Sequence, residues 1–308
     1  MKLRELQNFI AVASTGSIRA AARQQGLTPP ALTQSIARLE EELHAPLIVR
    51  TTRGAVLSKY GAAFLQRARL ITGEVEKACE EVAQMLGERS GLVTIGASMT
   101  PAITILPPAI ARFRHEMPDV RVNIVGGIHH QHLGPLRNGE MDFAIGPVPA
   151  SGLDPDIEVE PLFDNDLAVV AHRTNPLLHA RSLADLANAE WILTGPQTQG
   201  PGATLADAFR AHGFTPPRAM IQCDSILILQ TLLASTRMIC VLPRQLLSLS
   251  PWIHTVAAIP IAEPLPSFPI SLFRRADLPL LPAAQQLATL LRREAHYFTR
   301  QATSAGIP

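Results

Sequence analysis

The sequence predicts a multidomain chain of mixed class, in which a small α+β head precedes one long helix and an α/β body. Three observations predict this order. Two helical patterns meet at a tight turn near Gly26, an apolar heptad runs from Phe64 to Met85, and short apolar runs alternate with helical patterns beyond residue 91. Because each pattern has its own period, each segment is expected to form its own structural unit.

Composition and targeting signals indicate a soluble, cytoplasmic globular protein. The 308 residues are 47% hydrophobic and 17% charged, which is enough apolar material for two or three domains. Lys2 and Arg4 interrupt the first residues, and no apolar stretch is long enough for a membrane span. The three cysteines, Cys79, Cys223 and Cys240, have spacings unlike a metal knuckle or a disulfide framework, so reduced and mostly buried thiols are expected.

The basic residues gather at the start of the chain. Residues 1–59 contain eight lysines and arginines against four glutamates, whereas the remainder contains nineteen basic and twenty-two acidic residues. The net charge of +1 therefore divides into +4 for the head and −3 for the rest. This division fits phosphate attraction confined to one module, and it fits an ordinary solvated basic face equally well.

Residues 17–42 contain two helix starts and one sharp turn. Ser17 can cap a first short helix that Gly26 ends with a positive φ, and Thr28 can cap a second, which opens with two prolines. An earlier helix is expected over Leu3–Ser14. The three helices would form one small core.

The second of these short helices has distinct inner and outer faces. Its apolar positions are Leu32, Ile36, Leu39 and Leu43, which leaves Thr33, Gln34 and Arg38 pointing outward. Two short helices around a tight turn form a helix-turn-helix, whose second helix can enter the DNA major groove. An ordinary helical hairpin is the alternative.

A small β hairpin, or wing, is expected after the helices. Leu47–Val49 and Val56–Leu57 would be its strands, around a turn at Gly54. Arg50, Thr52 and Arg53 at its tip would contact phosphates or the adjacent minor groove. Without the preceding motif, the same residues would read as a solvated turn.

The spacing of particular residues over this first segment resembles the amino-terminal signature of LysR-type transcriptional regulators. The matching residues are Leu27, Thr28, Pro30, Ala31, Leu39, Glu40, Leu43, Leu47, Arg50, Arg53, Leu57, Ser58 and Gly61. The resemblance implies a winged helix-turn-helix that contacts DNA through Thr28, Pro30, Ala31, Thr33, Gln34, Arg38, Arg50, Thr52 and Arg53. Pro29 replaces a common glutamine and removes an amide that could read bases, while His44 and Ile48 replace a glycine and a phenylalanine near the turn before the wing.

Residues 58–87 predict one long helix with an apolar seam. The seam residues, spaced alternately by four and three, are Phe64, Ala68, Ile71, Val75, Ala78, Val82 and Met85. This heptad spacing is typical of paired helices, so we expect the segment to form a homodimer. The alternative is packing against the chain's own next domain.

Beyond residue 91 the chain alternates strands and helices. The expected strands are Leu92–Ala97, Val120–Val125, Met141–Ile145, Leu167–Ala171, Trp191–Leu193, Met220–Cys223, Met238–Leu242 and Ile270–Phe273. The expected helices are Ile103–His115, Gln131–Asn138, Ala203–His212, Ser225–Ala234 and Pro282–Phe298. This order indicates two similar α/β units with mainly parallel sheets, and the end of the chain returns to the first unit.

The family resemblance extends to the body. The effector half of LysR-type regulators is similar to periplasmic solute-binding folds, with two crossovers and a cleft between lobes. We therefore expect a DNA-binding domain at 1–58, a linker and dimerisation helix at 59–88, lobe I at 91–163 with 268–300, and lobe II at 164–267.

Three stretches could carry enzyme or metal chemistry, and each lacks part of the required set. Gly96–Thr100 approaches a nucleophile elbow, but a threonine replaces the second glycine. His129, His130 and His132 have no adjoining carboxylate or cysteine, which favours a cleft histidine or a solvated loop over a metal site. Gly195–Thr204 lacks the lysine of a phosphate-binding loop and reads as a cleft wall. No cofactor, metal or catalytic residue is expected.

The sequence therefore predicts a LysR-like regulator that binds dyad-symmetric operator DNA as a homodimer or homotetramer and responds to a small organic acid. The expected ligand-binding residues are Ser98, Thr100, Pro101, Ile128, His129, Pro147, Gly200, Pro201, Gly202, Ala203 and Ser225. Helix starts and hydroxyls at these positions favour an anion. Alternatively, these residues merely cap helices, or the fold serves a cytoplasmic enzyme or a solute-binding protein.

Overall fold

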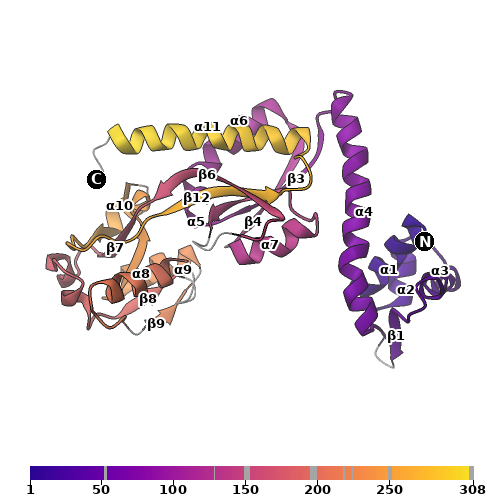
Figure 1. The fold of residues 1–308 in the computed structure, drawn as a ribbon, viewed down its shortest axis with the longest axis horizontal. Coiled ribbons are helices and arrows are strands. Elements are labelled where there is room, and N and C mark those ends of the chain that lie inside the picture. Colours follow the sequence, from indigo (N-terminus) through magenta and orange to yellow (C-terminus); the bar gives the residue numbers. More distant parts are fainter. Residues whose placement is uncertain are drawn as a thin grey trace.

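The computed structural model describes residues 1–51, 54–127, 129–148, 153–194, 200–217, 219–223, 225–248 and 252–304. A small head lies on one side of the long helix α4 (Lys59–Met85), and a body with two sheets lies on the other (Figure 1). The predicted mixed class is confirmed. None of the described helices is long and apolar enough to cross a membrane.

The head has one apolar core, which three helices and a hairpin share. Phe9, Leu32 and Leu39 are fully buried in it, and Phe64 from α4 packs its ring 5.6 Å from that of Phe9. The helix that was expected to end at Ser14 extends to Thr15. The head elements are α1 (Leu3–Thr15), α2 (Ile18–Gln24), α3 (Pro29–Glu42), β1 (Ile48–Thr51) and β2 (Gly54–Leu57).

The predicted apolar seam of α4 falls into two parts, one packed against the head and one exposed. Phe64 and Ala68 belong to the head core, whereas the seam from Ile71 onward is exposed. Ser58 caps the helix by accepting a hydrogen bond from the Gly61 N–H at 3.0 Å. The predicted helix is confirmed, and five of its seven seam residues are left on the surface of the chain.

Lobe I is a sheet of five strands in the order β4-β3-β5-β12-β6, in which β12 alone runs against the others. Helices α6 and α11 bury one face of the sheet, and α7 packs on the other (Figure 1). Its elements are β3 (Ser90–Ala97), α5 (Met99–Ile103), α6 (Leu106–Glu116), β4 (Asp119–Gly126), α7 (His129–Arg137), β5 (Phe143–Pro147), β6 (Ile157–Asn165), β12 (Phe268–Arg275) and α11 (Pro282–Ser304).

Lobe II repeats this plan with the order β11-β7-β10-β8-β9, in which β7 is the reversed strand. Trp191 and Phe209 centre its core. Its elements are β7 (Leu167–His172), η1 (Pro176–His179), η2 (Ala184–Leu186), β8 (Trp191–Leu193), α8 (Gly200–Ala211), β9 (Ala219–Gln222), α9 (Ile226–Ser235), β10 (Ile239–Pro243), η3 (Arg244–Ser248), α10 (Trp252–Thr255) and β11 (Val256–Ala258).

Several expectations for the body need correction. The helix expected over Ile103–His115 begins later, as α6 at Leu106, and a separate short helix, α5, which was not expected, ends at Ile103. The two are separate because Pro107 and Pro108 cannot donate the backbone bonds that would continue α5. Strand β6 was not expected at all, and it ends at Asn165, beyond the expected lobe boundary at 163. Helix α8 begins at Gly200 and not at Ala203.

Candidate functional site

Helix α3 is held by its inner face and presents its outer face. The Thr28 hydroxyl caps it by accepting a hydrogen bond from the Ala31 N–H at 3.3 Å. Leu32, Ile36 and Leu39 are buried beneath the helix. At its start Thr28, Pro30 and Ala31 are exposed, so the predicted cap is confirmed and the helix start is accessible.

The outer face of α3 carries polar side chains that make no hydrogen bond or ion pair within the described part of the chain. Gln34 and Arg38 are exposed and Thr33 is half-buried, as the spacing predicts. Among the residues that the structure describes, none of these three side chains has a hydrogen-bond or ion-pair partner. An exposed amide and guanidinium on one helix face match the donors and acceptors of base edges and phosphates.

The hairpin of β1 and β2 is fixed against this helical core. The Glu40 carboxylate accepts the N–H groups of Leu47 at 2.7 Å and Ile48 at 2.9 Å, which ties α3 to the first strand. Gly54 has a φ of 130°, and a Cβ there would lie 2.5 Å from the Gly16 carbonyl oxygen, so the close approach requires glycine. Arg50 lies in β1, but its side chain, Thr52 and Arg53 fall outside the described residues.

Ser98 begins the candidate effector site in lobe I. It follows β3, its N–H donates to the Ile145 carbonyl at 2.9 Å, and its carbonyl accepts the Ala102 N–H at 3.1 Å. Its hydroxyl is buried without a hydrogen-bond partner, although a buried polar group normally has one. Thr100 and Pro101 beside it are also buried.

A second buried hydroxyl belongs to Ser271 of β12, which sequence reasoning missed. Ser271 is paired with Gly146 across the sheet and has no hydrogen-bond partner. A Cβ at Gly146 would lie 2.9 Å from the Ser98 hydroxyl oxygen, so Gly146 leaves the space that this hydroxyl occupies. The signal available in the sequence was a lone polar residue between Ile270 and Leu272.

The lobe II side of the site is only partly as expected. Gly200–Ala203 form the first turn of α8, not the loop before it. Ser225 is exposed at the start of α9, and its hydroxyl caps no backbone N–H. Pro147 is half-buried at the end of β5, whereas Ile128 and the side chains of His129 and Pro201 fall outside the described residues.

Helix α5 brings the two halves together. Met99 and Ile103 project from lobe I and pack against a lobe II cluster that includes Ile226, the first residue of α9. Met99, next to Ser98, and Ile226, next to Ser225, therefore pack against the same apolar cluster. Helix α8 packs on β10 of its own sheet.

The two histidine side chains of α7 that the structure describes, His130 and His132, lie in different surroundings. His132 is buried against Gly96, where a Cβ would lie 2.7 Å from its ring, while His130 is exposed on the same helix. The part of the chain that the structure describes holds no group of three potential metal ligands. Cys223 and Cys240 are buried, and burial raises the pKa of the Cys240 thiol well above its ordinary value. Cys79 is exposed on α4, so two of the three thiols are buried, in line with the expectation of mostly buried thiols.

Two known protein families match this chain, one over the head and the other over the body. Residues 3–62 match the family described as bacterial regulatory helix-turn-helix protein, lysR family, and residues 86–296 match the LysR substrate binding domain. The chain is 30% identical to the transcriptional regulator GbpR of Azospirillum brasilense, over 98% of this chain and 89% of that protein.

A second relative and a solved structure agree. TdcA, a transcriptional regulator of Escherichia coli K12, is 28% identical over 96% of this chain and 94% of its own length. The crystal structure of CbnR, a LysR family transcriptional regulator, is similar in fold, with a TM-score of 0.69 and 23% identity over 96% of this chain and 99% of that one.

Proposed function

The chain belongs to the LysR family of bacterial helix-turn-helix regulators, and from this premise we propose how it reads DNA and what it senses. It is a DNA-binding transcriptional regulator with an effector-binding body. We infer that a dimer, assembling further into a tetramer, binds dyad-symmetric operators in the cytoplasm. The observation that carries this proposal is that Gln34 and Arg38 are both exposed on one face of α3 and have no partner within the described part of the chain.

Helix α3 enters the major groove and the wing lies on the adjacent backbone. Gln34 and Arg38 contact base edges or phosphates, with Thr33 and the helix start at Thr28, Pro30 and Ala31 beside them. Arg50, Thr52 and Arg53 belong to the wing contact. Because Pro29 lacks the side-chain amide of a glutamine, recognition of the base sequence depends more on Gln34 and Arg38.

Fluorescence anisotropy with labelled fragments of the chain's own upstream region tests this docking. Gln34→Ala and Arg38→Ala should each weaken binding by about 1–3 kcal/mol if the side chain contacts a base. Gln66→Ala and Arg67→Ala are matched controls, since both residues are exposed on α4. Full affinity in both α3 variants at moderate salt would refute the docking.

The exposed part of the α4 seam, from Ile71 to Met85, forms the dimer interface. Ile71 and Val75 are 39% and 40% exposed, and Val82 and Met85 are exposed further still. Such a stripe at heptad spacing is buried when a second copy pairs with it. Ile71→Asp should abolish dimers in sedimentation velocity, whereas Gln66→Asp, on the same helix, should not. An intact dimer in Ile71→Asp would place the interface elsewhere.

The effector is a small organic anion held between the lobes. Ser98, Thr100 and Pro101 supply one side, and the first turn of α8 (Gly200–Ala203) and Ser225 supply the other. The starts of α8 and α9 favour negative charge, while Pro147, with Ile128 and His129 beside it, covers the ligand's body. The unpartnered Ser98 hydroxyl and the exposed Ser225 support this assignment.

A thermal-shift series with the sodium salts of straight-chain acids from acetate to octanoate, and with benzoate, identifies a binding acid for titration calorimetry. Ser98→Ala combined with Ser225→Ala should reduce its affinity without lowering the melting temperature of the free protein, because neither hydroxyl has a partner to lose. Ser235→Ala, at the exposed end of α9, is the control. A large loss of stability in the double variant would make these residues structural.

A catalytic or transport role on the same fold is the second candidate. It predicts turnover or release of a bound acid without any effect on operator binding. Operator affinity that does not respond to any binding acid would favour it.

A further inference from the structure

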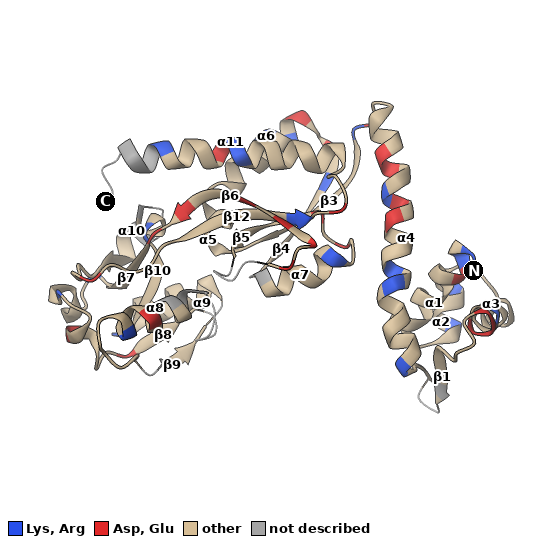
Figure 2. Cartoon of the chain, in the orientation of Figure 1, with Lys and Arg blue, Asp and Glu red and all other residues tan. Residues whose placement is uncertain are grey.

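The second half of α4 is attached to lobe I by polar contacts rather than by a shared core. The buried residues of α4 are Gly61, Ala68 and Thr72, all in its first half or at its middle. Beyond Thr72 the helix carries a band of acidic residues, which Figure 2 shows in red along its upper half. An attachment of this kind can separate without exposing a hydrophobic core.

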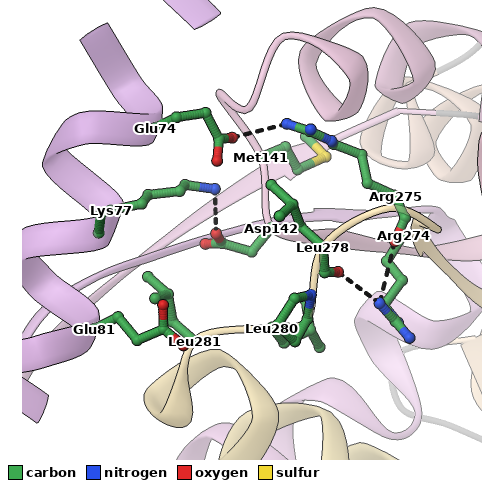
Figure 3. A pocket seen from close by; sticks show the side chains of 12 residues that line it. Glu74, Lys77, Glu81, Met141, Asp142, Arg274, Arg275, Leu278, Leu280 and Leu281 are labelled. Carbon is green, nitrogen blue, oxygen red and sulfur yellow. Dashed lines mark hydrogen bonds and ion pairs between the residues drawn. The ribbon is translucent and has the colours of Figure 1, made fainter. Parts of the chain in front are cut away.

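Two ion pairs dominate the attachment (Figure 3). The Lys77 ammonium lies 2.7 Å from the Asp142 carboxylate, and the Arg275 guanidinium lies 2.7 Å from Glu74. The Asp142 side chain is only 7% exposed, and its second oxygen accepts the Thr94 N–H at 2.8 Å. Because a nearly buried carboxylate is costly to leave without its cation, the Lys77 pair is the stronger of the two.

Two further side chains of α4 reach the start of lobe I. The Glu80 carboxylate accepts the Leu92 N–H at 2.9 Å. The Gln84 amide donates to the Ser90 carbonyl at 3.2 Å and accepts the Ala283 N–H at 3.0 Å. The helix is therefore held in one register along β3 and the start of α11.

The contact between α4 and lobe I is incompletely filled. A cavity of about 190 Å³ lies between Lys77 and Glu81 on the helix and residues 278–281 on the lobe (Figure 3). The cavity is partly open to solvent, so this part of the contact is not close-packed like a protein interior. The ion pairs consequently hold together two surfaces that apolar packing does not join.

The same contact lies at one end of the strand that reaches the candidate effector site. Asp142 immediately precedes β5, and β5 ends at Gly146 and Pro147, beside Ser98. Five residues of strand span roughly 16 Å at about 3.3 Å each. Residues 143–146 are buried, so a displacement at either end passes along a packed element.

We propose that Lys77–Asp142 and Glu74–Arg275 form a releasable latch that sets the position of α4, and with it the head, relative to lobe I. Lys77 and Asp142 are positioning residues that contact neither DNA nor effector. A movement of β5 on effector binding weakens the Lys77 pair and frees the head to change its angle. The link to the effector rests on the proposed function, whereas the latch itself does not.

Hydrogen exchange of the full chain, without DNA or acid, tests the latch directly. Lys77→Met keeps the aliphatic stem and removes the charge, and we expect exchange in residues 73–86 and at the Leu92 amide to rise at least about tenfold. Lys77→Arg should restore protection. Arg292→Met removes a lobe I ion pair to Glu160 that does not touch α4, and should leave residues 73–86 unchanged.

Unchanged protection of residues 73–86 in Lys77→Met would overturn the latch, and so would an equal rise in Arg292→Met. A second arm uses the acid found by thermal shift. Lys77→Met should bind it as tightly as the unmodified chain while operator affinity no longer responds to it. If no acid binds, the proposed effector class fails, and the exchange result still decides the latch.

Discussion

Lobe I and lobe II follow the same plan but are attached to the rest of the chain very differently. In both sheets the fourth strand of five is reversed, so that β4-β3-β5-β12-β6 corresponds to β9-β8-β10-β7-β11. Strand β3 with Ser98 thus corresponds to β8, and α7 corresponds to α9. The fold alone gives no reason for the lobes to play different roles.

The two lobes differ in the ion pairs that attach them to neighbouring elements. Lobe I is tied to α4 through Asp142 and Arg275 and to α11 through Glu160, which pairs with Arg292. The ion pair described for lobe II, Arg210–Asp207, lies within one exposed turn of α8. Lobe II joins lobe I through chain crossovers, α5 and Phe268, which packs on both cores. If the lobes close on an effector, lobe II moves relative to lobe I, and lobe I keeps its place beside α4 until the Lys77–Asp142 pair is released.

The largest expected effect comes from removing the centre of lobe II. Trp191 is fully buried, packs edge-on against Phe209 at 6.0 Å, and donates its indole N–H to the Leu186 carbonyl at 3.2 Å. Trp191→Ala should destabilise lobe II by about 3–5 kcal/mol. Because the lobes have separate cores, exchange protection should fall in 167–172 and 239–243 while 143–147 stays protected.

Phe143→Ala, in the core of lobe I, is the reciprocal variant and should expose 143–147 first. If Trp191→Ala removes protection from both lobes to the same extent, the lobes unfold as one unit. The comparison between an anchored and a mobile lobe would then lose its basis.

A smaller effect is expected at the lobe I end of the effector site. Gly146→Ala places a methyl group 2.9 Å from the Ser98 hydroxyl, which must shift, so a loss of about 1–3 kcal/mol is expected in urea unfolding. Gly134→Ala is the control. Gly134 lies in α7 with nothing within 4 Å of the added group, so the helix should gain up to about 1 kcal/mol. A neutral Gly146→Ala would show that the hydroxyl is free to move.

The sequence specified the head more completely than the body because the head's signals are local. Ser17, Gly26 and Thr28 sit where their caps and positive φ are required, so the helix boundaries could be read from neighbouring residues. In the body, β6 was missed because its run contains three acidic residues and a proline and is stabilised by pairing with the distant β12.

The candidate site shows the same limit. Ser98 and Ser225 were found because a strand precedes and a helix follows them, which is a local pattern. Ser271 comes beside Ser98 only through the pairing of β12 with β5 across Gly146, and no spacing in the sequence reports that contact. The exposure of α4 from Ile71 onward likewise depended on where lobe I docks.

The smallest effect compares ion pairs of the two lobes. Arg292 binds both oxygens of Glu160 at 2.8 Å, and this hydrogen bonding raises the pKa of the guanidinium above its ordinary value. Arg210 and Asp207 are 62% and 66% exposed, so solvent screens their pair.

Arg292→Met should lower stability by about 1 kcal/mol or less, and Arg210→Met by nothing measurable. Because its raised pKa keeps Arg292 charged, the contribution of its pair should persist from neutral to mildly alkaline pH and shrink as salt is added. Urea unfolding at low and high salt measures it, and an equal loss in the two variants would mean that the ion pairs of lobe I hold it no more firmly than that of lobe II.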